Sequence, residues 1–227
     1  DQNINIMSAN LTALRRMDEK YHDFSNRFDL LTADGKGLNL FSGILGKKIN
    51  NHVRICDLSD ALIENAYRNS QKIYLLGAKK KVNDGAQKKL FSSYNNIQCK
   101  GNHGYFSDDE FEHILLDIIN YKPDLIIVGI SSPKKEQTIL KISEVYSGST
   151  NIASGGYLDL ISGKTKYSPR WVQIIGMEWI FRFLQEPKRM FGPMLLNGFY
   201  FLFLIFPKAL FIKIVFRKVY NIFYENK

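Results

Sequence analysis

The sequence predicts an α/β fold: a Rossmann-like, mostly parallel sheet flanked by helices, with a C-terminal helical appendage that associates with a membrane. Short apolar runs alternate with longer segments of helical periodicity, which is the order of a βαβ series. A chain of 227 residues can bury one core of this kind. An apolar stretch with flanking Lys and Arg then closes the sequence. We therefore expect a main domain over residues 1–190 and the appendage over residues 191–227.

Six apolar runs are the expected strands, in chain order NINIMSA, RFDLLTA, KIYLLGA, NIQCKG, DLIIVGI and NIASGG. The expected helices lie near residues 11–21, 58–70, 80–93, 107–121, 133–147 and 169–185. Ligands of such sheets bind at the carboxyl ends of the strands, where Gly77, Gly129 and the pair Gly155-Gly156 fall. No Gly-x-Gly-x-x-Gly follows a strand and no Walker-type loop is present, which argues against an ordinary dinucleotide or ATP site.

The composition argues against several other classes of protein. Hydrophobic residues make up 45% of the chain and charged residues 23%, as in ordinary globular domains. The start of the chain lacks a basic segment followed by an apolar core, so we expect a cytoplasmic protein. Cys56 and Cys99 have no metal-ligand spacing, the four histidines are scattered, and the pair Asp108-Asp109 is best explained by capping of a helix. We expect neither a metal nor another cofactor.

The net charge of +9 is concentrated near the C-terminus. From Gly163 onward eleven Lys and Arg stand against three Glu, which indicates an anionic partner such as lipid headgroups. Nucleic acid is disfavoured because the basic residues alternate with long apolar runs. The uncharged run 193–206 is too short to span a bilayer and is followed by Pro207 and Lys208, so we expect an interfacial helix. The alternative is a buried C-terminal helix or the interface of a homo-oligomer.

Polar residues follow the first two expected strands. Asp34 stands between Ala and Gly at the end of the second strand, where its carboxylate would face a crevice and could act as a general base. Ser8 and Asn10 follow the first strand and could bind hydroxyl groups. The alternatives are local: Asp34 in an Asx turn or as a helix cap, and Asn10 as the cap of the helix that starts at Leu11.

The stretch from Gly155 to Arg189 combines a Gly-Gly turn, a carboxylate and a Trp-rich helix closed by Glu-Pro-Lys-Arg. The glycines let backbone N–H groups approach a ligand, and Asp159 follows at an expected strand end. Arg182 and Arg189 could donate to phosphate. The alternative is a turn followed by an amphipathic helix with a solvated basic face.

Five boxes of this chain, in order, are similar to those of the WecG/TagA/CpsF glycosyltransferases, glycosyltransferase family 26. These are Ser8-Ala9-Asn10, Ala33-Asp34-Gly35, Gly104-Tyr105-Phe106, Pro133-Lys134-Lys135-Glu136-Gln137 and the stretch from Gly155 to Arg189. The resemblance implies an inverting, metal-independent transfer from a UDP-sugar to a polyprenyl-diphosphate-linked saccharide. It implies a location on the inner face of the cell membrane, in the synthesis of teichoic acid, capsule or exopolysaccharide.

The resemblance gives Asp34 the role of base. We add Asn10, Arg182 and Arg189 as the other candidate catalytic residues. The candidate substrate-binding residues are Ser8, His52, Arg54, Asp57, Gly77, Tyr105, Gly129, Lys134, Lys135, Glu136, Gln137, Gly155, Gly156 and Asp159. For two of them a local role is the alternative, because Asp57 opens a helix and a lone loop tyrosine such as Tyr105 usually packs.

The chain departs from the family pattern at several positions. His52 replaces an Arg, with Arg54 as the candidate to compensate, and Ile55 replaces a Gly. Lys135 replaces a Gln, Tyr167-Ser168 replaces Arg-Ala, and Gly192 replaces an Arg. We therefore keep two alternatives: a catalytically weak membrane-surface protein that binds nucleotide sugar or acts as a scaffold, and a basic nucleic-acid-binding module.

Overall fold

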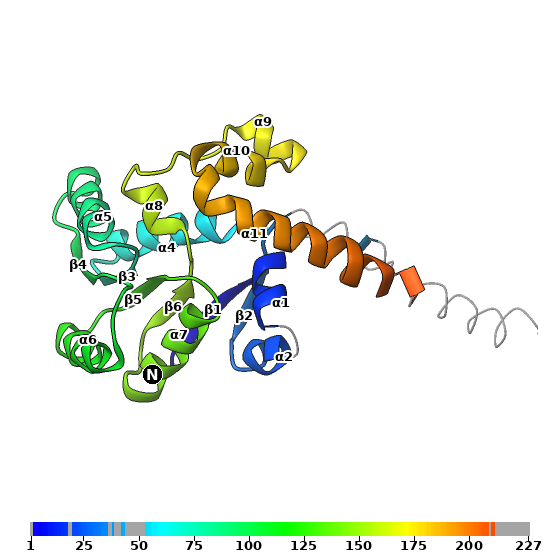
Figure 1. The fold of residues 1–227 in the computed structure, drawn as a ribbon. Helices are drawn as coiled ribbons and strands as arrows, with labels where there is room; N and C mark the ends of the chain where they lie inside the picture. The colour runs from blue at the N-terminus through cyan, green and yellow to red at the C-terminus, as the bar shows by residue number, and fades with distance from the viewer. Residues whose placement is uncertain are drawn as a thin grey trace, which may run out of the picture. The chain divides into compact units, whose positions relative to one another are not determined.

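The structure is a computed structural model that describes residues 2–17, 20–35, 38, 42, 43, 53–208, 210 and 211. These residues contain a six-stranded sheet with the order β2-β1-β6-β5-β3-β4 (Figure 1). Its strands are β1 Ile4–Ala9, β2 Leu30–Ala33, β3 Lys72–Gly77, β4 Gln98–Asn102, β5 Leu125–Gly129 and β6 Thr150–Ala153. The pairs β1–β6, β6–β5, β5–β3 and β3–β4 are parallel. All six strands overlap the runs predicted from the sequence, and β4 and β6 each extend one residue beyond their run, to Asn102 and from Thr150.

Helices cover both faces of the sheet because its central strands are apolar on both sides. In β3, Ile73 and Leu75 belong to the core cluster under helices α4 Ile55–Arg68 and α5 Lys80–Ser93 (Figure 1). Tyr74 points to the other face, and its hydroxyl donates at 2.8 Å to Asp117 of helix α6 Asp108–Tyr121. The edge strands β2 and β4 carry exposed side chains instead.

The remaining helices are α1 Leu11–Met17, α2 Lys20–Ser25, α6 Asp108–Tyr121, α7 Lys134–Val145, α8 Tyr157–Ile161, α9 Arg170–Ile175, α10 Glu178–Gln185 and α11 Pro187–Phe199. Of the expected helix near 11–21, residues 11–17 belong to α1 and residues 20–21 to α2. The expected helix 169–185 is two helices in the structure, α9 and α10. They are separate because Gly176, with a φ of 79°, closes α9 in the left-handed conformation. The two tryptophans, Trp171 and Trp179, therefore lie on different helices.

The N-terminus of α6 corrects the expected capping role of Asp108 and Asp109. The cap is Ser107, whose hydroxyl accepts from the Glu110 backbone N–H, while the Glu110 carboxylate accepts from the Ser107 N–H at 2.7 Å. These bonds lower the pKa of Glu110. Both aspartates lie in the first turn, where their charge complements the helix dipole.

The chain divides into two compact units. The first holds residues 1–8, 16–32 and 53–167, and the second holds residues 9–15, 33–52 and 168–227. The first therefore contains most of the sheet with α4 to α8, and the second contains α9 to α11 with the residues that follow β1 and β2. The predicted boundary between residues 190 and 191 falls inside α11.

The apolar tail forms a longer helix than expected. Helix α11 continues through a π-helical segment, Tyr200–Ile205, so that the helix runs from Pro187 to Lys208 over 22 residues. Among the described residues, it is the one helix long and apolar enough to cross a membrane, judged by length and composition. At 1.5 Å per residue the whole helix, with Lys188, Arg189 and Lys208 near its ends, measures about 33 Å and is long enough to span a bilayer, whereas the uncharged run 193–206 alone is too short. Its large apolar side chains are exposed, among them Phe199 and Phe203, at 58% and 66%.

Candidate active site at the carboxyl ends of the strands

Three glycines pack closely where β3 and β5 end. Gly77 has φ +149°, and a Cβ there would lie 2.5 Å from the Gly129 carbonyl oxygen. A Cβ on Gly129 would lie 2.8 Å from Leu158 Cδ1, and one on Gly104 would lie 2.9 Å from Gly77 Cα. Side chains at these positions are therefore excluded by neighbouring atoms. The glycines bring the ends of two strands and the loop after β4 into one place, the predicted position for a ligand.

The Gly155-Gly156 turn connects β6 to α8 beside the same edge. A Cβ on Gly155 would lie 3.0 Å from the Ile130 carbonyl oxygen and 3.9 Å from Lys135 Cδ. The turn thus lies against the segment that follows β5 and over the side chain of Lys135. This contact joins two of the predicted boxes, the Pro-Lys box and the Gly-Gly turn.

Lys135 and Glu136 form a buried ion pair in the first turn of α7. Their side chains are 5% and 0% exposed, and Lys135 Nζ lies 3.3 Å from Glu136 Oε1. Oε1 also accepts from the Ser132 hydroxyl at 2.9 Å, whereas Oε2 is buried and has no hydrogen-bond partner among the described residues. A buried pair of this kind is costly unless its charges are well compensated. The sequence placed both residues at this junction but did not indicate their burial.

Lys134, Gln137 and Tyr105 are exposed, in contrast to that pair. Lys134 Nζ donates to the Phe106 carbonyl oxygen at 3.1 Å and lies 4.0 Å from the centre of the Phe106 ring. The side chain of Tyr105 is 69% exposed. The structure therefore brings the Gly-Tyr-Phe box and the Pro-Lys box together and leaves the Tyr105 ring open to solvent.

An ion pair between the half-buried Arg54 and the exposed Asp57 lies at the start of α4. Arg54 Nε donates to Asp57 Oδ2 at 2.7 Å, and Arg54 Nη2 donates to the other carboxylate oxygen. The helix begins at Ile55 with Arg54 as its N-cap residue, so Asp57 lies inside the first turn and does not cap it. His52 lies outside the described residues.

Asp60, one turn further along α4, connects three segments and was not predicted. Its carboxylate accepts from the hydroxyl of Tyr157, the first residue of α8, and at 2.9 Å from the hydroxyl of Tyr167. Burial and the nearby carboxylate raise the pKa of both tyrosines, so both hydroxyls stay protonated. The partners are 97 and 107 residues from Asp60, so no local pattern signals the cluster. Tyr167, which stands where the family pattern has Arg, thus contacts a carboxylate in this chain.

We expect Tyr157→Phe to lower the free energy of unfolding by about 1.5–3 kcal/mol, because it removes a hydrogen bond to a charged acceptor. The pKa of Tyr157 is higher in the folded protein than the ordinary tyrosine value of about 10. The stability that this hydrogen bond contributes is therefore fully present below about pH 10 and is lost only at higher pH. The loss should therefore be equal at pH 6 and pH 8.5. Urea unfolding at both pH values measures it, with Tyr105→Phe as an exposed control. A loss under 0.5 kcal/mol, or one that differs between the two pH values, would contradict this role.

Asp159 differs from its predicted setting. It lies inside the short helix α8 and not at a strand end, and it is 7% exposed. Its Oδ1 accepts a hydrogen bond from Lys164 Nζ at 2.9 Å. The chain forms a helical turn directly after Gly156, which carries Asp159 into the protein. Its carboxylate is thus already bound by a cation of its own unit.

Asp34 and Asn10 come together at the ends of β2 and β1. The Asp34 backbone N–H donates to the Ala9 carbonyl oxygen at 2.9 Å, which places Asp34 beside the residue that precedes Asn10. Asp34 directly follows the last residue of β2, as predicted, and is half-buried. Asn10 Oδ1 accepts from the Ala13 N–H at 2.9 Å, so its capping role is observed. Ser8 lies within β1 and is 1% exposed, which corrects its expected place after the strand.

The two candidate arginines lie on α10 and α11. Arg182 is in the last turn of α10. Arg189 is in the first turn of α11, and its guanidinium lies 2.8 Å from Glu186 Oε2. All four predicted catalytic residues fall in the second unit, and every described substrate-binding candidate falls in the first. Among the described residues, no three His, Cys, Asp or Glu side chains gather as metal ligands would.

Comparison with known proteins identifies the family of this chain. The pattern of the glycosyl transferase WecG/TagA/CpsF family matches residues 1–214. The chain is 31% identical over 189 residues to the N-acetylglucosaminyldiphosphoundecaprenol N-acetyl-beta-D-mannosaminyltransferases of Staphylococcus aureus strains MW2 and MRSA252. Each match covers 82% of this chain and 74% of the relative. The resemblance carried by the five boxes is confirmed, and the chain belongs to the WecG/TagA/CpsF family of glycosyl transferases.

Proposed function

We propose that the chain is an inverting, metal-independent glycosyltransferase. It moves a sugar of the N-acetylmannosamine type, or a hexose, from a UDP-sugar to a polyprenyl-diphosphate-linked saccharide in cell-surface polysaccharide synthesis. The names of the relatives support this class of donor sugar and of acceptor, since they are N-acetyl-beta-D-mannosaminyltransferases of N-acetylglucosaminyldiphosphoundecaprenol. A hydroxyl of the acceptor would attack the anomeric carbon of the donor, and UDP would leave.

The position of Asp34 carries this proposal. A half-buried carboxylate at the carboxyl end of β2, held beside β1, suits a general base that takes the proton of the attacking hydroxyl. Asn10, next to it, would orient the same hydroxyl by hydrogen bonding once a substrate competes with its capping role. Arg182 and Arg189 would balance the charge that develops on the departing diphosphate.

The donor site would use the cluster of strand ends in the first unit. The close packing at Gly77, Gly129 and Gly155 brings the ends of β3, β5 and β6 together, at the edge of a parallel sheet where ligands bind. The N-terminus of α7 offers N–H groups with Lys134 beside them, a setting that favours phosphate. The exposed Tyr105 ring would stack on uracil or on the sugar.

A UDP-stabilisation screen and a transfer assay test the proposal together. A ligand that binds the folded state raises the apparent stability, so UDP should raise the melting temperature whereas AMP should not. Radiolabelled UDP-N-acetylmannosamine should then yield a labelled lipid with undecaprenyl-diphosphate-N-acetylglucosamine as acceptor. Stabilisation without transfer from this donor or a UDP-hexose would favour the nucleotide-sugar-binding scaffold instead. Absence of stabilisation by UDP or any UDP-sugar would contradict the proposal.

The tail would hold the enzyme at an anionic membrane surface, where a lipid-linked acceptor resides. Asn197, in the middle of the apolar helix, accepts from Arg15 Nε and donates to the Thr12 hydroxyl, both at 2.7 Å. Both partners lie on α1 in the same unit, so a strongly polar contact holds the middle of the helix to protein. This contact supports peripheral docking over a crossing helix, because a spanning helix would carry these polar groups into hydrocarbon.

We expect a chain that ends after Phe199 to leave anionic vesicles while keeping α11 and the Asn197 contacts. The truncation removes five Lys and Arg, each worth about 1 kcal/mol near an anionic surface. Co-sedimentation with phosphatidylglycerol vesicles measures the loss. The full chain should pellet with vesicles and be released by alkaline carbonate; a full chain that resists carbonate would show a spanning helix. Equal pelleting of both chains would contradict the docking role.

A further inference from the structure

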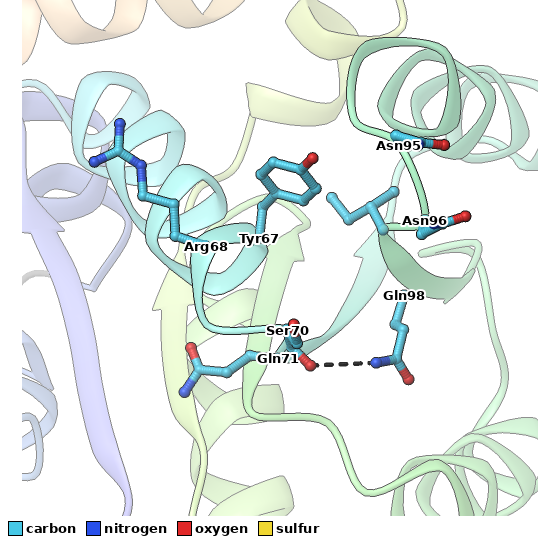
Figure 2. A pocket seen from close by; sticks show the side chains of 8 residues that line it. Tyr67, Arg68, Ser70, Gln71, Asn95, Asn96 and Gln98 are labelled. Atoms are coloured by element: carbon cyan, nitrogen blue, oxygen red, sulfur yellow. Dashed lines mark hydrogen bonds between the residues drawn. The ribbon is translucent and has the colours of Figure 1, made fainter.

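A pocket lies at the amino-terminal ends of β3 and β4, away from the strand ends of the candidate active site (Figure 2). Its volume is about 320 Å³, at the lower end of the range of about 300–1,000 Å³ for small-molecule sites. The end of α4, the turn before β3 and the loop before β4 form it. Its lining residues are Tyr67, Arg68, Ser70, Gln71, Asn95, Asn96, Ile97 and Gln98.

The polar groups of this pocket are mostly neutral amides. Gln71, Asn95, Asn96 and Gln98 each offer a donor and an acceptor, as a sugar hydroxyl does. The charge of Arg68 is paired, since its Nε lies 2.9 Å from Glu64 Oε1. In Figure 2 the Arg68 side chain extends away from Asn95 and Asn96. The lining therefore suits an uncharged, hydroxyl-rich ligand better than an anion or a lipid.

An aromatic wall and a fixed floor complete the pocket. The Tyr67 ring packs against Tyr94 with ring centroids 4.9 Å apart, which holds it in place. The flat C–H face of a sugar ring packs well on such a ring. Gln98 Nε2 donates to the Ser70 carbonyl oxygen at 3.2 Å and bridges the two walls (Figure 2).

We propose that this pocket binds a neutral saccharide at a site separate from the transfer site. The two lie at opposite ends of β3, whose six residues Lys72–Gly77 span about 20 Å at roughly 3.3 Å per residue. The volume and the side-chain amides of the pocket suit one or two uncharged sugar units. In an N-acetylated sugar, the acetamido group would form hydrogen bonds with these side-chain amides. An enzyme of lipid-linked saccharides would thus hold a second saccharide without using its transfer site.

Titration of the full chain in detergent micelles, followed by ¹H–¹⁵N NMR, tests the proposal with N-acetylglucosamine and its β1,4-linked dimer. We expect saturable shifts of the Asn95, Asn96 and Gln98 side-chain amides with a dissociation constant on the order of 1 mM. Sodium phosphate and UDP should leave these signals unmoved. Shifts caused by phosphate and not by the sugars, or no sugar-dependent shift up to about 50 mM, would overturn the proposal.

Two substitutions locate the binding in the pocket. Asn96 has φ 59°, so Asn96→Gly removes the amide and keeps the backbone conformation. Combined with Gln98→Ala, which also removes the hydrogen bond to Ser70, it should weaken saccharide binding at least tenfold while the chain stays folded and UDP binding stays unchanged. Asn120→Ala, an exposed amide on α6, is the matched control. Unchanged saccharide affinity in the double variant would overturn the proposal, and because the readout is binding, the result is independent of sugar transfer.

Discussion

We expect Asp34→Asn to reduce kcat by about 10²–10⁴-fold, the contribution of a general base, while UDP binding stays nearly intact. Asparagine keeps the shape of the side chain and one acceptor oxygen, but its amide nitrogen donates and the side chain cannot take up the proton. The Asp34 backbone N–H still pairs with Ala9, so the end of β2 should keep its place. Transfer to a lipid-linked acceptor measures kcat, and UDP-induced stabilisation measures binding.

The control for this prediction is Asp23→Asn, an exposed carboxylate on α2. It should leave both kcat and the melting temperature unchanged. If Asp34→Asn keeps near-normal transfer, then Asp34 is the local turn or cap residue of the alternative interpretation, and the base lies elsewhere. A large loss of stability in Asp34→Asn would indicate the same structural role.

We expect Arg182→Ala and Arg189→Ala each to reduce kcat by about 10–150-fold. Removal of a charge-assisted donor to a diphosphate costs about 1.5–3 kcal/mol, which converts to this range. Because the two guanidinium groups would neutralise the departing diphosphate in place of a metal ion, transfer should also survive EDTA. A strict requirement for Mg²⁺ or Mn²⁺ would contradict this part of the mechanism.

The Arg189 result needs a second variant because Arg189 pairs with Glu186, whose side chain is 14% exposed. Loss of Arg189 alone leaves that carboxylate without this partner, which by itself can impair folding. The double variant Glu186→Gln, Arg189→Ala removes the charge as well. It should restore stability but not kcat; recovery of kcat would assign Arg189 a structural role. Arg170→Ala, an exposed residue of α9, is the control for general loss of positive charge.

Much of the local structure follows from the sequence pattern. Helix α5 lies where the helical periodicity placed it, and all six strands overlap the predicted apolar runs to within one residue. The position of Asp34 after β2 was also predictable, because a strand end is a local feature. Two errors have local causes as well. The periodicity predicted one helix across Gly176, but this glycine ends α9. The sequence also predicted that Asp108 and Asp109 cap α6, whereas Ser107 is the N-cap residue.

The sequence by itself determined the family, the six strands in their order, and the place of Asp34 at a strand end, because these depend on periodicity and on short motifs. The tertiary structure decided which of those residues meet. Asp60 binds tyrosines 97 and 107 residues away, and Asn197 bonds to Arg15 across 182 residues. It also decided that Lys135 and Glu136 are buried while Lys134 is exposed. Burial and long-range partners depend on how separate segments pack, and a pattern read along the chain does not contain that information.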